Sequence, residues 1–166
     1  MTKDHRTVDL TLAGPDRVRA FLTNYTLLNP SYQGFDREIL KSLVLVSATP
    51  TTAVFELTIK PAYTNGLNNL HGGCAALIYD ICTSAALMVI AREGFWEFVG
   101  VSRNLNVTYI RPVPCGTKVT ILSEVVHAGQ RLATIRGVMK TEDGKVVSTA
   151  EHTKVNLTNV PGKSQL

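Results

Sequence analysis

One long apolar segment constrains the fold of this chain more than any other feature. Residues 72–92 are rich in Ala, Leu, Ile and Met, and Asp80 is their only acidic residue. These residue types favour a helix over a strand. The length approaches the ~20 apolar residues of a membrane span, but a carboxylate at mid-span costs roughly 2.5–3.5 kcal/mol. The segment therefore predicts a core helix that is buried on most of its faces, and no membrane span.

The segments before and after this helix have the composition of β-strands. Two Val- and Thr-rich runs precede it, and Pro50-Thr51-Thr52 between them predicts an antiparallel pair. Four more runs follow, with a hairpin turn signal at Glu142-Asp143-Gly144. Strands and helices do not alternate, which argues against a parallel sheet. The expected class is α+β, with one long antiparallel sheet wrapped around a central helix. The expected strands are residues 43–49, 53–60, 99–110, 118–127, 132–141 and 145–157.

An extra helix is expected near the N-terminus, from Pro15 to Asn29-Pro30, because apolar residues recur there at helical spacing. These residues are Val18, Phe21, Leu22 and Tyr25. Residues 31–38 and 61–70 have the composition of loops. The expected organisation is an N-terminal arm and helix at residues 1–40, one main domain at 41–157 and a C-terminal tail at 158–166.

Charge and cysteine content restrict the partners. The formal net charge is +4, which suits an anionic small molecule, and no long Lys/Arg run or nucleic-acid motif occurs. The three cysteines form no CxxC pair, so neither a metal site nor a disulfide framework is expected. The N-terminus has no apolar signal core. The expected compartment is the cytoplasm or the mitochondrial matrix.

The residues around the start of the central helix are the candidates for chemistry. Asn65 lies in the preceding loop, and His71-Gly72-Gly73 opens the helix, where unpaired N–H groups create a partial positive charge. The Gly72 N–H is a candidate donor to a carbonyl oxygen that becomes an oxyanion. His71 supports that oxygen or holds the loop. Asp80 is a candidate base or nucleophile, although each of these residues alone also has a structural explanation.

The spacing of these residues predicts a dimer. Asp80 lies eight residues after Gly72, which is roughly 12 Å along a helix axis. It cannot easily act on a carbonyl that Gly72 of the same chain holds. If both serve one site, Asp80 comes from a second subunit whose helix runs antiparallel to the first. A second subunit also explains why both faces of the expected strand at residues 118–127 are apolar.

The pattern of Asn65, Leu70-His71-Gly72-Gly73 and Asp80 resembles the signature of the hotdog-fold thioesterases, and in particular their PaaI-like branch, which includes the thioesterase superfamily member 2 type. The resemblance extends over Gly100-Val101-Ser102, Asn106-Val107-Thr108-Tyr109 and His152-Thr153-Lys154. It implies hydrolysis of acyl-CoA, with Asp80 activating water or attacking directly. It also implies that Ser102 orients the water, that Asn65 positions the water or the carbonyl, and that Gly72 and His71 polarise the carbonyl.

The same resemblance implies where coenzyme A approaches and how the protein assembles. No cofactor is expected, because coenzyme A is part of the substrate. The assembly would be a homodimer at minimum, and a homotetramer as a dimer of dimers. The connection at residues 91–99 departs from close relatives in its length and carries Phe95 and Trp96. The expected CoA-binding residues are Gly73, Arg103, Tyr109, Arg111, Pro112, His127, Gly129, Gln130 and Arg131.

Other functions fit the sequence less well. A serine hydrolase needs G-x-S-x-G, and Gly100-Val101-Ser102-Arg103-Asn104 lacks the final glycine. A hotdog hydratase needs a His shortly after Asp80, and residues 81–92 contain none. A non-catalytic acyl-CoA-binding or regulatory protein stays open as the alternative. It would have no need for Asp80, Asn65 and Ser102 together.

Overall fold

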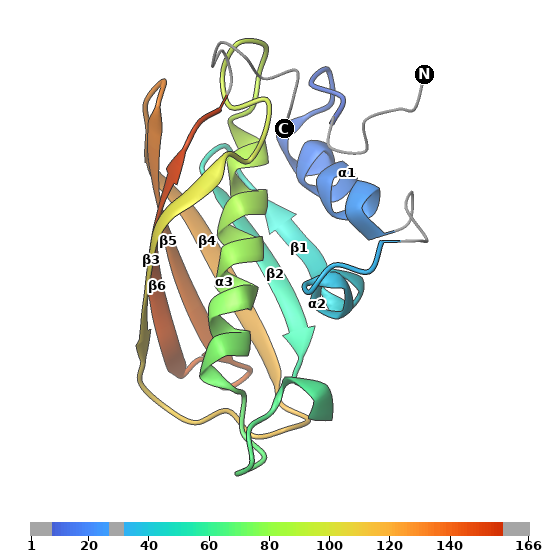
Figure 1. The fold of residues 1–166 in the computed structure, drawn as a ribbon, viewed down its shortest axis with the longest axis vertical. Helices are drawn as coiled ribbons and strands as arrows, with labels where there is room; N and C mark the ends of the chain where they lie inside the picture. The colour runs from blue at the N-terminus through green and yellow to red at the C-terminus, as the bar shows by residue number, and fades with distance from the viewer. Residues whose placement is uncertain (1–7, 27–31, 158–166) are drawn as a thin grey trace.

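The computed structural model describes residues 8–26 and 32–157, and its main element is a six-stranded antiparallel sheet (Figure 1). The strand order is β1-β2-β4-β5-β6-β3. The predicted pair before the central helix is confirmed as β1 with β2, and the predicted hairpin turn joins β5 to β6 through Gly144, whose φ is 80°. The strands are β1 (Val44–Ala48), β2 (Thr52–Thr58), β3 (Val101–Tyr109), β4 (Lys118–Ala128), β5 (Leu132–Thr141) and β6 (Val146–Val155).

Helix α3 (Gly72–Ala86) lies across one face of this sheet, as predicted for a central helix (Figure 1). The expected end at Arg92 is wrong, because a 3₁₀ turn at Leu87–Val89 replaces the last α-helical turns. The Arg17 guanidinium donates hydrogen bonds to the carbonyl oxygens of Met88 and Val89, at 2.9 and 3.0 Å. These carbonyls therefore do not need the N–H groups of a longer helix. By length and composition Gly72–Val89 could cross a membrane, but 67% of it is buried inside the protein.

The inner face of the sheet packs on α3 with alternating buried residues. On β4, Val119, Ile121 and Val125 are buried, whereas Val126 on the other face is half exposed. Gly137 on β5 lies directly under the Tyr79 ring, and a Cβ there would approach the ring to 2.6 Å. The Tyr79 hydroxyl forms a 2.9 Å hydrogen bond with Ser148 Oγ on β6. These contacts fix the rotation of α3 about its axis.

Of two N-terminal helices, α1 (Gly14–Thr26) packs beside α3 and β1, and α2 (Arg37–Ser42) packs against α1 (Figure 1). Helix α1 confirms the extra helix, and its expected end at Asn29-Pro30 lies outside the described residues. The loop expected at residues 31–38 is wrong in its last part, because α2 begins at Arg37. Two buried residues, Ile39 and Leu40, anchor this short helix. The expected division at residue 40 falls inside α2, and the N-terminal arm before residue 8 and the tail from 158 lie outside the described residues.

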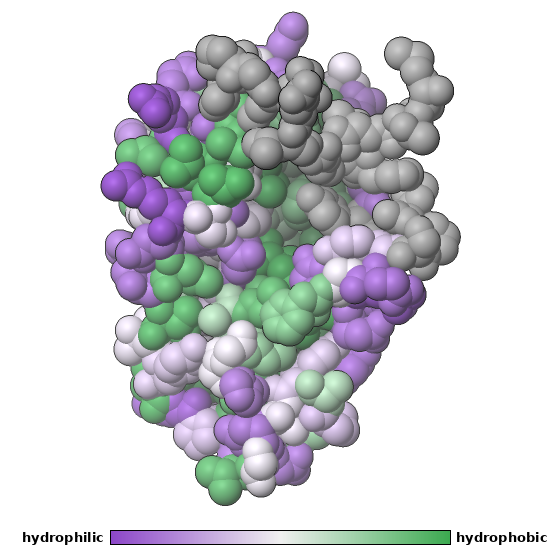
Figure 2. Space-filling view, in the orientation of Figure 1, coloured by the Kyte–Doolittle hydropathy of each residue, from purple (hydrophilic) through white to green (hydrophobic). Residues whose placement is uncertain are grey.

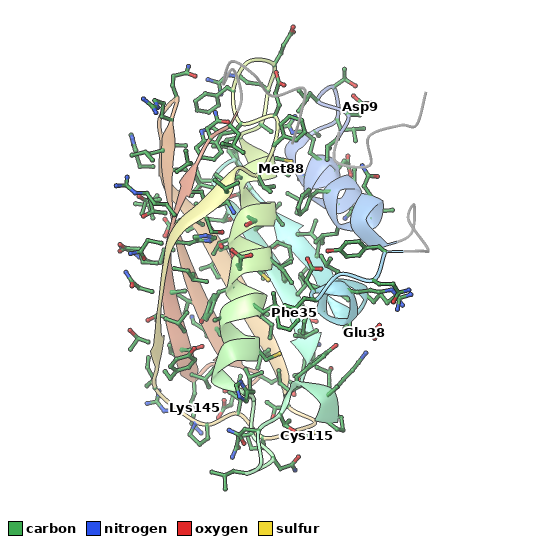
Figure 3. All side chains as sticks on the ribbon, in the orientation of Figure 1. Asp9, Phe35, Glu38, Met88, Cys115 and Lys145 are labelled. Carbon is green, nitrogen blue, oxygen red and sulfur yellow. The ribbon has the colours of Figure 1, made fainter. Side chains whose placement is uncertain are left out.

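The two ends of α3 can be located in the figures by labelled residues. Met88 lies near its C-terminal end, and Lys145 in the β5–β6 hairpin marks the opposite end of the molecule (Figure 3). On the face that carries α3, apolar side chains gather in the middle and polar ones towards the borders (Figure 2). Phe35, which precedes α2, is 90% exposed on this face (Figure 3).

Candidate active site

The first turn of α3 is organised by His71 and exposes a backbone donor. The His71 Nδ1 accepts a 3.0 Å hydrogen bond from the Gly73 N–H, so the imidazole caps the helix. The Gly72 N–H is also in the first turn, where no intrahelical acceptor is available. The expected contact of His71 with the substrate oxygen stays a prediction. A Cβ on Gly72 would meet the Tyr109 ring at 3.4 Å, so the ring lies directly beside the first turn of the helix.

Asn65 holds the loop that leads into this helix. Its Oδ1 accepts hydrogen bonds from the Leu67 N–H at 2.9 Å and the Asn69 N–H at 3.2 Å. The amide oxygen is therefore occupied, and the Nδ2 group is the part of the side chain that remains for a ligand. Because Nδ2 carries only donors, Asn65 can bind a carbonyl or water oxygen but not a water proton.

A pocket of about 380 Å³ lies at the N-terminal end of α3 and is lined by several of the expected site residues. The Tyr109 hydroxyl donates to the Gly72 carbonyl at 2.8 Å, which ties the end of β3 to the helix. Arg111 donates from Nη1 to the Val146 carbonyl, so part of its guanidinium holds the start of β6. The expected site residues that line the pocket are Asn65, Gly72, Tyr109, Arg111 and Pro112.

Asp80 and Ser102 form a second centre, further along α3. The Ser102 hydroxyl donates to Asp80 Oδ1 at 2.7 Å, and the Asp80 side chain is 42% exposed. Ser102 lies beside a β-bulge, because the β3–β6 register shifts between Ser102 and Asn104. Bulges redirect neighbouring side chains. The carboxylate is thus oriented through one oxygen and can receive a ligand at the other.

Asp80 faces a buried histidine that the sequence did not mark as functional. His152 Nε2 lies 3.5 Å from Asp80 Oδ1, and His152 is fully buried. The Thr83 hydroxyl donates to the Tyr79 carbonyl at 2.5 Å, so it accepts from His152 Nδ1–H at 2.6 Å. In the neutral imidazole, Nε2 then carries a lone pair, and it has no hydrogen-bond partner among the described residues. Burial and the nearby Lys154 ammonium lower the pKa of His152, against the opposing effect of Asp80.

A cavity of about 250 Å³ adjoins Asp80 and Ser102. Phe21 of α1 and Leu40 of α2 form part of its wall, with Ile81 and Val99, so the N-terminal helices contribute to the site. Ser84 and Lys154 give the cavity a polar side. Phe21 and Leu40 could not be assigned to the site from the sequence, since α1 and α2 lie far from the motif in the chain.

The third group of expected residues lies at the opposite end of the sheet from Tyr109. His127 is near the end of β4, and Gly129, Gln130 and Arg131 form the turn to β5. Tyr109 ends β3, which runs antiparallel to β6, at the end where the β5–β6 hairpin lies. One chain therefore does not bring Tyr109–Pro112 and His127–Arg131 together. The side chains of Arg103 and Arg131 are exposed.

Two unexpected residues hold the turn from β4 to β5. The Trp96 Nε1–H donates to the Gly129 carbonyl at 2.8 Å, and the Trp96 side chain is fully buried. Asn156 Nδ2 donates to the Gln130 carbonyl at 3.0 Å, and its backbone N–H donates to the Arg131 carbonyl. The connection at residues 91–99 thus braces this turn through Trp96. No cluster of three or more potential metal ligands occurs within residues 8–26 and 32–157.

Three comparisons connect this geometry with known proteins. The family model described as thioesterase superfamily matches residues 67–148. Acyl-coenzyme A thioesterase 13 of Mus musculus is 35% identical over 123 residues, which cover 73% of this chain and 84% of that protein. The crystal structure of mouse thioesterase superfamily member 2 has a TM-score of 0.71 at 27% identity, over 87% of this chain and 98% of the other. The E. coli PaaI protein, at 18% identity over 69% of this chain and 82% of its own, shows the shared fold, with a TM-score of 0.62. The hotdog fold expected from the sequence is confirmed.

Proposed function

This chain belongs to the thioesterase superfamily, and from that premise we propose that it hydrolyses acyl-CoA thioesters to the free acid and CoA. The observation that carries the proposal is the 2.7 Å hydrogen bond from Ser102 to the half-exposed Asp80 carboxylate. A carboxylate that is held by a donor at one oxygen and open at the other is suited to take a proton from water.

The reaction that we propose has one carbonyl site and one water site. The thioester oxygen binds at the Gly72 N–H, with Asn65 Nδ2 as a second donor. Asp80 removes a proton from water, whose oxygen attacks the carbonyl carbon, and the negative charge develops on the oxygen at Gly72. The C–S bond then breaks, and the CoA thiolate leaves and takes up a proton. The positive end of the α3 dipole supports the oxyanion.

The water site and the carbonyl site come from different subunits in this proposal. Gly72 and Asp80 are roughly 12 Å apart along α3, which is too far for one attacking water to reach a carbonyl held by the same chain. The pocket at Gly72 and the cavity at Asp80 also have separate linings. An antiparallel partner helix would bring one of each together, giving two composite sites per dimer.

Thiol release from acyl-CoA tests this function. Wild-type protein is expected to release free thiol from at least one member of a series of short-chain, long-chain and aryl acyl-CoAs. Asp80→Asn should lower kcat by roughly 10²-fold or more, because general-base catalysis contributes on that order. Glu151→Gln is the matched control, since Glu151 is exposed on β6.

Two outcomes would redirect the proposal. Full activity in Asp80→Asn would contradict the role of Asp80. Binding of acyl-CoA without turnover by any substrate would favour the non-catalytic alternative. Single-turnover hydrolysis in ¹⁸O-labelled water separates two mechanisms, because label in the Asp80 carboxylate would indicate that Asp80 attacks the carbonyl directly.

A further inference from the structure

Lys154 on β6 is a buried lysine that the proposed reaction does not use. It is 3% exposed and lies two residues after His152, so both side chains point to the inner face of the sheet. Its Nζ donates to Ser84 Oγ at 2.6 Å and to Ser102 Oγ at 3.4 Å. Within the described part of the chain, no carboxylate lies within ion-pair distance of the ammonium.

Such a cation is costly to bury. An ammonium that loses water without a paired carboxylate destabilises the folded state. Burial lowers the pKa of Lys154 to about 8, although the Asp80 carboxylate acts in the opposite direction. A methionine of similar length would fill the same space without this cost. The contacts of the ammonium therefore point to a role other than packing.

The two hydroxyl groups beside Lys154 define that role. An ammonium has three donors and no acceptor, so the Ser102 oxygen must accept the hydrogen bond from Lys154. The single hydroxyl proton of Ser102 is then left for Asp80 Oδ1, at 2.7 Å. Ser102 and Lys154 are direct cross-strand partners in the β3–β6 register, which keeps the two side chains together. Ser84 holds the ammonium from α3, one turn after Asp80.

We propose that Lys154 is a positioning residue for the Asp80 carboxylate, which it orients through the Ser102 hydroxyl. This inference rests on the proposed thioester hydrolysis. With the ammonium present, Ser102 donates to Asp80 in one direction only, and the second carboxylate oxygen stays directed at the water. Without it, the hydroxyl can turn and donate elsewhere, and the carboxylate loses its orientation.

The inference also predicts an effect of pH. Other charged or titratable groups near the ammonium are Asp80 on α3, His152 on β6 and Asp36, which precedes α2 and lines the same cavity. As the pH rises through about 8, Lys154 loses its proton and becomes able to accept the Ser102 proton. Activity should then decline. Lys154→Arg should restore the alkaline side of the profile, because arginine keeps its charge there and the adjoining cavity offers room.

The experiment compares Lys154→Met and Lys154→Arg with wild type and with Lys140→Met, a control on the exposed part of β5. We expect Lys154→Met to lower kcat roughly 10- to 100-fold with KM little changed, as for a displaced reacting group. Its Tm should be equal to or above that of wild type, because a buried charge is removed. A purely structural lysine would instead lower Tm and leave kcat per folded molecule unchanged.

A double-mutant cycle with Ser102→Ala decides whether Lys154 acts through Ser102. If it does, Lys154→Met costs almost nothing further in the Ser102→Ala background. Additive losses would overturn the inference, as would unchanged kcat in Lys154→Met while wild type is active. If wild type releases no thiol, the proposed function fails, and a crystal structure of Lys154→Met still tests the contact. Retention of the 2.7 Å Ser102–Asp80 hydrogen bond in that structure would contradict the positioning role.

Discussion

A hydroxyl, an ammonium and a neutral imidazole lie on one side of the Asp80 carboxylate. Ser102 donates a hydrogen bond to Oδ1, Lys154 lies behind Ser102, and His152 directs a lone pair at the same oxygen from 3.5 Å. Two acceptors that face each other repel unless one of them carries a proton.

His152 should make the stability of the protein depend on pH. Its pKa is lowered below 6.5 in the folded state, chiefly by burial, so the unfolded chain binds more protons just below that value. Stability therefore rises with pH through this window and falls as the pH drops below about 6.5. His152→Asn, whose amide can still donate to Thr83, should flatten this dependence. Thermal unfolding at several pH values measures it.

The informative quantity in that experiment is the change of Tm with pH, and not the Tm at one pH. Carboxylates distant from position 152 contribute equally to the acid sensitivity of wild type and variant, so the difference between the two slopes belongs to His152 and its neighbour Asp80. Identical slopes below pH 6.5 would mean that His152 is not kept neutral by its burial.

The motif identified the candidate reacting residues, but not the residues that hold them in place. Asn65, Gly72 and Asp80 could be named because a loop, a helix start and a mid-helix carboxylate have recognisable spacing, and Ser102 could be named from the family resemblance. Lys154 and His152 could not, because their roles depend on which residues of β3 and α3 lie opposite them. The available signals were the family resemblance over His152-Thr153-Lys154 and a Lys at a position where the alternation of β6 requires a buried residue.

At the level of elements, most helices and strands are determined by local sequence pattern, and a few boundaries are determined by tertiary packing. All six strands and both longer helices could be predicted from residue type, since period and turn residues are local properties. The end of α3 could not, because Arg17 of α1 satisfies its last carbonyls from a distant part of the chain. Helix α2 has only six residues, which is too short for a helical period to stand out.

The absence of a side chain at Gly137 determines how closely α3 packs on the sheet. Gly137→Ala should destabilise the protein by roughly 1–3 kcal/mol, because its Cβ would lie 2.6 Å from the Tyr79 ring, which Ser148 holds in place. Alanine in a strand otherwise stabilises relative to glycine, so the sign of the change is diagnostic. Urea unfolding measures it.

Gly66→Ala is the control for this substitution, since a Cβ at Gly66 meets nothing within 4 Å. A second variant identifies the cause. Tyr79→Leu removes the ring, so Gly137→Ala should cost less in the Tyr79→Leu background than in wild type. Equal costs in the two backgrounds would mean that the Tyr79 ring is not what limits position 137.

On the scale of the whole molecule, a single chain keeps the two parts of the proposed site apart. The Gly72 end and the Asp80 centre belong to separate hollows, and the residues expected to bind coenzyme A lie at opposite ends of the sheet. Strand β3 is a sheet edge and is exposed along most of its length. Exposed edges of this kind pair readily with a second chain. A partner related by a two-fold axis would bring the two ends of the sheet together. Phe35, which is exposed on the face that carries α3, is available to contact such a partner.

Mixed dimers can therefore regain activity from two inactive variants. Asp80→Ala removes the base, and Asn65→Asp removes the Nδ2 donors while keeping the oxygen that holds the loop. In a heterodimer of the two, one site combines the intact Asn65 and Asp80, and the other combines both defects. After subunit exchange at equal concentrations, half of the dimers are mixed, so thiol release should recover to about a quarter of the wild-type rate.

The matched control places both substitutions in one chain and mixes that chain with wild type. If each site is composite, mixed dimers contain no intact site, and the activity per total subunit falls to about a quarter of wild type. If each chain carries its own complete site, half of the activity remains, and the two single variants never rescue each other. Exchange is verified with differently tagged subunits, so half activity in the control together with no rescue would exclude the shared site. The two mixtures have the same composition and differ only in how the substitutions are distributed between chains, so circular dichroism of the doubly substituted chain is needed to show that it folds.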